Sequence, residues 1–254
     1  MREENEHAAL LPEQALAADT GVKAMIPVGR PFLDYVLSSV ADAGFSDVCL
    51  VIGPEHAKVR HYYEREMVPM RIRISFAEQL RPLGTADAVL AAEPFAAEDS
   101  FVVLNSDNYY PAPALAELQR LREPALIAFE RDALIEMGNV LADRVSRFGA
   151  LDIGPDGFLR RILAKPDEEM PRDGKAIYVS LNCWVFTPGI FRACREIPLS
   201  PRGEFELPKA VQLAIDRFGM RFRAIKARAR VLDLSSRGDI AAVAEHLRDV
   251  GVSL

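Results

Sequence analysis

Apolar and polar positions alternate between helical and strand-like spacing from Pro31 onward. After Pro31 the apolar residues recur every three or four positions up to Gly44, which predicts a helix that ends at a glycine. The run VCLVIG at residues 48–53 predicts a buried strand. Further helices are expected over residues 55–67, 85–92 and 111–122, and further strands over 71–76, 101–104 and 125–129. This alternation is typical of an α/β fold with a mostly parallel, Rossmann-like sheet flanked by helices.

The pattern changes beyond residue 137, where antiparallel pairing is expected. The turn sequence GPDG at residues 154–157 lies between two strand-like arms and predicts a hairpin. The run IYVSLNCWVF at residues 177–186 predicts one long strand. Helices near 188–194, 207–218 and 239–250 and a last pair of strands at 222–225 and 230–232 complete the pattern. We therefore expect one domain over residues 1–254 with a small antiparallel lobe. Within it, residues 1–22 are expected to form an atypical helical segment.

Composition and charge narrow the classes of function. Half of the 254 residues are apolar, which is enough for a sizeable core. The net charge of -6 gives no electrostatic reason to expect nucleic acid or an anionic membrane as a partner. Cys49, Cys183 and Cys194 are too widely spaced for a disulfide framework or a cysteine metal site. We predict a cytoplasmic protein that does not bind membranes and leave a homo-oligomer open.

Carboxylates follow two of the expected strands. Asp107 and Asn108 come just after the strand at 101–104, and Asp233 follows a short apolar strand near the end of the chain. Ligands of open α/β sheets bind at the carboxyl ends of the strands, and Mg²⁺ favours one or two carboxylates together with phosphate oxygens. Turn formation and helix capping explain the same residues equally well, so these observations leave both interpretations open.

Other polar residues also stand out from an ordinary core. Near the expected start of a helix lie Gln79, Gly84 and Thr85. They predict a surface that a flat polar ligand or an anion can approach closely. Thr85 as the N-cap of the helix explains the same sequence without a ligand. Lys165 precedes a proline, and Glu204 precedes a helix; both are ordinary solvated positions. Asn182 lies inside a strand-like run, where an amide needs a partner or faces a pocket.

Taken in order, these segments resemble the sugar-1-phosphate nucleotidyltransferases over nearly the whole chain. The matching segments are Lys23 with the following Ile-Pro-Val and Gly-Arg-Pro, residues 79–86 as a nucleobase loop, Asp107-Asn108, Lys165-Pro166, Asn182 and Asp233. The resemblance implies a nucleotide-diphospho-sugar transferase fold. It also implies nucleoside triphosphate and sugar phosphate as substrates, with Mg²⁺ as cofactor.

The resemblance also implies a role for each residue. The phosphate oxygen of the sugar phosphate attacks the α-phosphorus and pyrophosphate leaves. Asp107 and Asp233 hold the metal, and Lys23 and Lys165 neutralise phosphate charge. The base contacts Gln79, Gly84 and Thr85, whereas the remaining residues expected to bind the acceptor are Asn108, Asn182 and Glu204.

Departures from the family pattern keep two alternatives open. Ser106 replaces a glycine, Ala164 replaces a glutamate that contacts sugar hydroxyls, and Leu234-Ser235 replaces the usual pair after the second aspartate. One alternative is a catalytically impaired regulatory paralogue that binds sugar or nucleotide. The other is a nucleotidyltransferase whose acceptor is a phosphorylated amino alcohol.

The largest departure concerns the start of the sequence. Members of the family open with an apolar strand and a glycine-rich loop that holds the triphosphate, and neither precedes Lys23 here. We expect codons upstream of Met1 to encode both. We also expect the 254-residue chain to be unstable or nearly inactive, because neighbouring strands lose their ladder partners and the triphosphate loses its amides.

Overall fold

The computed structural model describes residues 22–145, 148–163 and 176–254. The strands of this part are β1 (Asp47–Ile52), β2 (Arg73–Glu78), β3 (Phe101–Val103), β4 (Asn108–Tyr109), β5 (Ala125–Glu130), β6 (Ala150–Ile153), β7 (Leu159–Leu163), β8 (Tyr178–Val179), β9 (Trp184–Phe186), β10 (Arg223–Ala227) and β11 (Leu232–Asp233). The α-helices are α2 (Phe32–Asp42), α3 (Ala57–His61), α4 (Thr85–Ala91), α5 (Glu93–Ala96), α6 (Ala112–Gln119), α7 (Arg131–Met137), α8 (Ala142–Val145), α10 (Gly189–Glu196), α11 (Leu207–Phe218) and α12 (Asp239–Leu247). Three short helices, η1 (Lys23–Met25), η2 (Pro54–His56) and η3 (Tyr62–Glu66), complete the set. The α/β class predicted from the alternation is confirmed.

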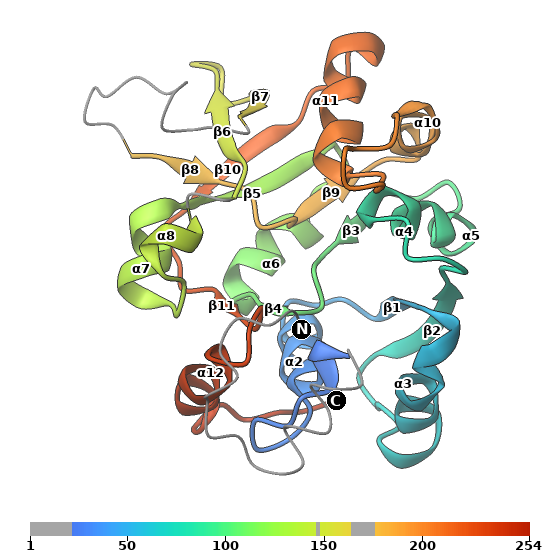
Figure 1. Cartoon of the computed structure of the whole chain (residues 1–254), viewed down its shortest axis with the longest axis vertical. Helices are drawn as coiled ribbons and strands as arrows, with labels where there is room; N and C mark the ends of the chain where they lie inside the picture. Colours follow the sequence, from blue (N-terminus) through green and yellow to red (C-terminus); the bar gives the residue numbers. More distant parts are fainter. Residues whose placement is uncertain (1–21, 146–147, 164–175) are drawn as a thin grey trace.

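The strands form three sheets (Figure 1). The larger sheet has the order β3-β9-β5-β8-β6-β7, with β10 paired to β5, while β1 pairs with β2 and β4 with β11. Pairing is parallel in β1–β2 and β5–β10 and antiparallel in the other pairs. The expected hairpin at residues 154–157 is present between β6 and β7. The two last strands do not pair with each other, because β10 lies beside β5 and β11 beside β4.

The strand expected over residues 177–186 is broken, so that prediction was wrong in one respect. β8 and β9 both pair with β5, but residues 180–182 between them leave the ladder, which resumes at the Cys183 carbonyl. Asn182 has a φ of 53°, a left-handed conformation that asparagine adopts more readily than most residues. The irregularity turns the Asn182 side chain away from the regular alternation of the strand.

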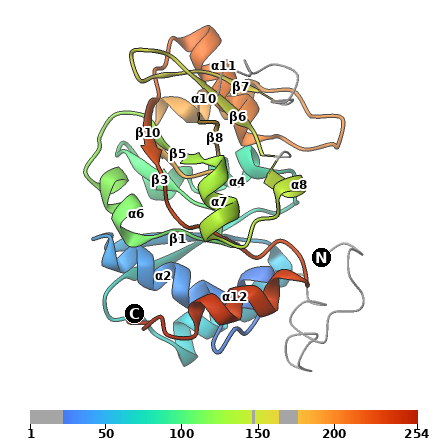
Figure 2. The same cartoon turned by 90° about the vertical axis from the view of Figure 1, so that its left-hand side faces the viewer.

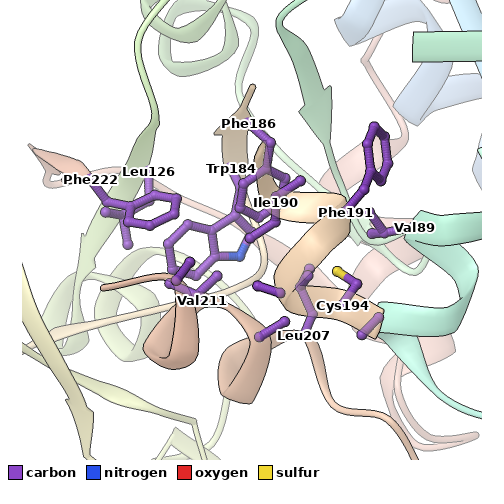
Figure 3. Close-up of a cluster of buried hydrophobic side chains, with 14 of the residues drawn as sticks. Val89, Leu126, Trp184, Phe186, Ile190, Phe191, Cys194, Leu207, Val211 and Phe222 are labelled. Carbon is purple, nitrogen blue, oxygen red and sulfur yellow. The ribbon is translucent and has the colours of Figure 1, made fainter. Parts of the chain in front are cut away.

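An aromatic cluster packs α10 and α11 against the larger sheet (Figure 3). Trp184, Phe186 and Phe222 are fully buried, with neighbouring ring centroids 5.8 to 6.0 Å apart. Aromatic rings bury large apolar areas, so this cluster contributes strongly to the packing of α10 and α11 on the sheet. On the other side of the molecule α2 and α12 lie side by side and share a second core cluster (Figure 2). Within the described part of the chain, no helix combines the length and the apolar character needed to cross a membrane.

An apolar groove separates β1 from β3. Among the described residues β1 pairs with β2 alone and β3 with β9 alone, so each strand has one open edge. The groove has a volume of about 630 Å³ and is lined by both strands and by α2 and α4. Figure 2 shows these two helices on opposite sides of β1.

A buried carboxylate holds α2 to the segment that follows β1. Asp34 has no exposed surface and accepts hydrogen bonds from the hydroxyls of Tyr62 and Tyr63, at 3.0 and 2.9 Å. Burial raises the pKa of Asp34, whereas the two hydroxyls and Arg30 oppose that rise. The folded protein therefore holds this proton to a higher pH than the unfolded chain does.

We expect Asp34→Asn to change how stability depends on pH. Because the pKa of Asp34 is raised in the folded state, its contribution is fully present below the ordinary value of 3.8 and is lost as pH rises through the raised pKa. The stability advantage of the wild type over Asp34→Asn should thus fall as the pH rises above about 4, as measured by urea unfolding. Asp99→Asn, at an exposed position, is the control. An advantage that grows with pH would contradict the prediction.

Candidate functional site

A two-residue antiparallel ladder brings the two predicted metal carboxylates together. Asp233 pairs with Asn108, and Leu232 with Tyr109. The Leu234 amide also donates to the Asp107 carbonyl, at 2.9 Å. Asp107 and Asp233 are therefore held on adjacent backbone segments, although they are 126 residues apart in the sequence. Their role as metal ligands stays a prediction.

Asp107 forms an ion pair with Lys23. The Lys23 Nζ lies 3.6 Å from Asp107 Oδ2, and both side chains are about one-third exposed. Lys23 belongs to η1, the short turn that precedes α2, so the pair links the entry of α2 to the loop after β3. A lysine and a carboxylate at an open edge are chemically suited to bind a phosphate and its counter-ion.

The Asp233 side chain, unlike that of Asp107, is buried. Its Oδ1 accepts hydrogen bonds from Asn108 Nδ2 at 3.1 Å and from Ser235 Oγ at 2.6 Å. Its Oδ2 lies 3.1 Å from Arg144 Nη2 but accepts no hydrogen bond from any described residue. Burial raises the pKa of Asp233, while the Ser235 hydroxyl and the Arg144 charge oppose the rise.

The sequence did not reveal Arg144 as part of this site. Its guanidinium lies in α8 and pairs with Asp233 and with Asp239, the latter at 2.8 Å. Nearby, Asn139 accepts a hydrogen bond from the Asp233 amide and donates one to the Asp233 carbonyl, each at 2.8 Å. Neither residue follows a strand or stands in a recognisable motif, so no local signal could have singled them out.

Side-chain amides connect Asn182 to Asp233. Asn182 Nδ2 donates to Asn105 Oδ1 at 3.4 Å, and Asn105 Nδ2 donates to Asn108 Oδ1 at 3.2 Å. Asn108 then donates to Asp233, and Asn182 itself accepts a hydrogen bond from the Trp184 indole at 3.3 Å. Asn105 was not among the residues predicted from the sequence, although its place after β3 was a usable signal.

The predicted nucleobase loop lies at the start of α4. Gln79 Nε2 donates to the Gly84 carbonyl at 3.0 Å and to Asp87 Oδ2 at 2.8 Å, which closes the loop. Thr85 is not the N-cap, contrary to the alternative considered above. Gly84 occupies that position, and the Thr85 hydroxyl accepts a hydrogen bond from the Leu207 amide at 2.9 Å.

Glu204 lies beside this loop. A Cβ built on Gly84 would come within 3.0 Å of the Glu204 Cβ. Glu204 is partly buried, and one of its carboxylate oxygens is 3.8 Å from Arg202. The remaining predicted residue, Lys165, lies outside the described residues.

The donor atoms at the ladder suit a hard cation. Asp107 offers a partly exposed carboxylate, and the Oδ2 of Asp233 is a buried acceptor without a hydrogen bond. Such oxygens are the ligands that Mg²⁺ favours when phosphate and water complete its shell. In residues 22–145, 148–163 and 176–254 no three His, Cys, Asp or Glu side chains gather closely enough to form a metal site by themselves.

Comparisons with known proteins identify the family. Residues 16–234 match a family model described as nucleotidyl transferase. A glucose-1-phosphate thymidylyltransferase of Streptomyces antibioticus is 32% identical over 201 residues, covering 78% of this chain and 52% of that protein. The UTP–glucose-1-phosphate uridylyltransferase AglF of Haloferax volcanii is 30% identical over 213 residues, covering 84% of this chain and 82% of that protein. This chain thus spans about half the length of the thymidylyltransferase and most of AglF.

A solved structure shows the same fold. A UDP-glucose pyrophosphorylase in complex with UDP-glucose superposes with a TM-score of 0.72 and 18% sequence identity. The superposition covers 89% of this chain and 90% of that one. The predicted nucleotide-diphospho-sugar transferase type of fold is therefore confirmed.

We expect Gly84→Ala to destabilise the protein more than Gly203→Ala does. Both glycines have positive φ, but a Cβ at Gly84 would lie 2.7 Å from the Phe205 carbonyl oxygen, whereas nothing lies within 4 Å of one at Gly203. Gly203→Ala should cost about 1–2 kcal/mol through its backbone conformation alone. Gly84→Ala should cost clearly more in urea unfolding, and equal losses would show that the close approach to Phe205 is unimportant.

We expect Arg144→Met to lower the free energy of unfolding by about 3–5 kcal/mol, because it leaves the buried Asp233 carboxylate unpaired. Asp233→Asn should cost much less when it is introduced into the Arg144→Met protein than into the wild type. A double-mutant cycle by urea unfolding measures this coupling. If the two losses simply add, Arg144 does not stabilise the carboxylate.

Proposed function

This chain belongs to the nucleotidyltransferase family, and we propose that it transfers a nucleotidyl group from a nucleoside triphosphate to a sugar 1-phosphate, giving an NDP-sugar and pyrophosphate. The observation that carries the proposal is the convergence of Lys23, Asp107 and Asp233 at the edge of the sheets. The loop at residues 79–85 reaches the same place through Thr85, which borders one groove together with Asp107 and Asn182.

The protein contributes little covalent chemistry to this reaction. An oxygen of the sugar phosphate forms a bond to the α-phosphorus, and the bond from that phosphorus to the bridging oxygen breaks. Pyrophosphate leaves with the electron pair, and no side chain needs to remove a proton because the attacking phosphate oxygen is already ionised. Catalysis then depends on positioning and on charge neutralisation.

The residues divide between these two tasks. Mg²⁺, when bound, would neutralise phosphate charge, and Asp107 and Asp233 would hold it. Lys23 would bind a phosphate if Asp107, its partner in the ion pair, were engaged by the metal. Gln79, Gly84 and Thr85 would contact the base, while Asn108, Asn182, Glu204 and Lys165 would bind the acceptor. We also infer a reducing cytoplasm as the site of action, since all three cysteines are free thiols.

A regulatory paralogue remains the second candidate, and one observation favours it. Arg144 holds Asp233 and Lys23 holds Asp107, so both carboxylates already have cationic partners within the chain. Such a protein would bind nucleotide or sugar phosphate without converting it.

The test is to incubate the protein with each nucleoside triphosphate, Mg²⁺ and a panel of phosphorylated acceptors, and to follow pyrophosphate. The panel includes sugar 1-phosphates and phosphorylated amino alcohols. Activity with a sugar 1-phosphate supports the proposal, and activity with amino alcohol phosphates alone changes the acceptor. Saturable binding with no pyrophosphate from any pair would establish the regulatory alternative.

We expect Asp107→Asn to lower kcat by about 10²–10³, by analogy with the loss of one charge-stabilising group in other active sites. Asp99→Asn removes the same charge just before β3, at the end of that strand opposite to the site, and should leave the rate unchanged. Steady-state rates of pyrophosphate release compare the two variants. Equal activity of Asp107→Asn and wild type would remove Asp107 from the mechanism.

A further inference from the structure

Arg144 is shared unequally between two buried carboxylates, those of Asp233 and Asp239. Its Nη1 donates hydrogen bonds to both oxygens of Asp239, at 3.0 and 2.8 Å. Its Nη2 lies 3.1 Å from Asp233 Oδ2, but neither of these two atoms makes a hydrogen bond with any residue of the described ranges. Asp239 therefore fixes the guanidinium, whereas Asp233 attracts it by charge alone.

Asp239 is itself fixed by the turn that leads into α12. Its Oδ2 accepts hydrogen bonds from the Ser236 amide at 2.7 Å and from the Ser236 hydroxyl at 2.9 Å. Asp239 is the first residue of α12, and its side chain is 9% exposed. A carboxylate held in this way can keep Arg144 in place without help from Asp233. Arg144 therefore stays beside Asp233 Oδ2 even when that oxygen takes another partner.

Asp233 Oδ2 is the oxygen that remains for a second partner. The other oxygen, Oδ1, already accepts hydrogen bonds from Asn108 and Ser235. A buried carboxylate oxygen without a hydrogen bond is costly unless a cation lies against it. Two cations can meet that need: the guanidinium of Arg144, and the divalent ion that the proposed function places at Asp107 and Asp233. They compete for the same oxygen.

The two cations also repel each other. The side chain of Arg144 is 17% exposed and that of Asp233 is 3% exposed, so water screens their charges only in part. Lys23 differs in this respect, because its ion pair with Asp107 is 3.6 Å long and about one-third exposed. Such a pair is well screened and separates at little cost. Arg144 is thus the stronger of the two competitors for a metal ligand.

We propose that Arg144 sets the metal affinity of the candidate site: it neutralises Asp233 when no divalent ion is bound, and it weakens the binding of that ion. This role rests on the proposed function, which makes Asp107 and Asp233 the metal ligands. Arg144 is a positioning residue, since it acts through Asp233 and touches neither the substrates nor the reacting atoms. The positive charge at residue 144, more than the shape of the side chain, carries the effect.

The experiment titrates the 254-residue protein and its variants with Mn²⁺ alone and follows the electron paramagnetic resonance of the free ion, since Mn²⁺ accepts the same oxygen ligands as Mg²⁺. The Coulomb energy of charges this close exceeds the thermal energy even at a high effective dielectric constant, so Arg144→Met should bind Mn²⁺ at least about tenfold more tightly than wild type. Arg144→Lys keeps a point charge but not the planar fork, and its affinity should stay within about threefold of wild type.

Arg192→Met is the matched control. Arg192 pairs with Glu196 in α10, which Figure 1 shows on the other side of the molecule from α8. Its loss removes the same charge from an exposed ion pair and should leave the affinity for Mn²⁺ unchanged.

Thermal unfolding gives a second readout that does not depend on a fully stable variant. Mn²⁺ gives the buried Asp233 carboxylate a new cationic partner, so it should raise the Tm of Arg144→Met more than that of wild type. When Asp233→Asn is added to Arg144→Met, both the gain in affinity and the larger rise in Tm should disappear.

Three results would overturn the role of Arg144 and leave nucleotidyl transfer untouched, because pyrophosphate release tests that reaction separately. The first is an equal affinity of wild type and Arg144→Met for Mn²⁺. The second is an equal gain in Arg144→Met and Arg144→Lys, which would make the fork and not the charge responsible. The third is a gain that survives Asp233→Asn, which would place the ion elsewhere. A lack of Mn²⁺ binding in every variant would overturn the metal assignment together with the role of Arg144.

Discussion

The site depends on the short ladder between β4 and β11. This pairing fixes Asp233 opposite Asn108 and, through the Leu234 amide, holds Asp107 beside it. Because backbone hydrogen bonds set the positions of both aspartates, their side chains do not have to attract each other to stay close, and electrostatics alone would drive two carboxylates apart. The protein offsets that repulsion locally with Lys23, which pairs with Asp107, and Arg144, which pairs with Asp233.

The side-chain hydrogen bonds that connect Asn182, Asn105, Asn108 and Asp233 extend this constraint to the aromatic cluster. The left-handed backbone at Asn182 aims its side chain at Asn105, and the Trp184 indole of the aromatic cluster donates to the same amide. A partly buried polar network of this kind is rigid when each member is hydrogen-bonded, and the loss of one member leaves its partners unsatisfied. The packing of α10 and α11 on Trp184 is therefore coupled to the position of Asn108, and through it to Asp233.

The sequence predicted those parts of the site that carry local signals. Asp107 and Asp233 were singled out because each follows an apolar strand, and the α/β alternation could be predicted because buried helices and strands have different periods. Arg144 and Asn139 were not found, since their partners are more than 80 residues away and nothing nearby marks them. The break at Asn182 was missed for a related reason: β8 and β9 read as one apolar strand, and only their shared pairing with β5 shows where the ladder is interrupted.

The groove between β1 and β3 also bears on the candidate site. Lys23, Asn105 and Asp107 line it and offer hydrogen bonds to water or to a polar ligand. The side chains with which α2 and α4 line it are almost all apolar. A few converging polar groups beside an apolar wall are typical of ligand pockets, so the groove gives the candidate site both a polar and an apolar surface.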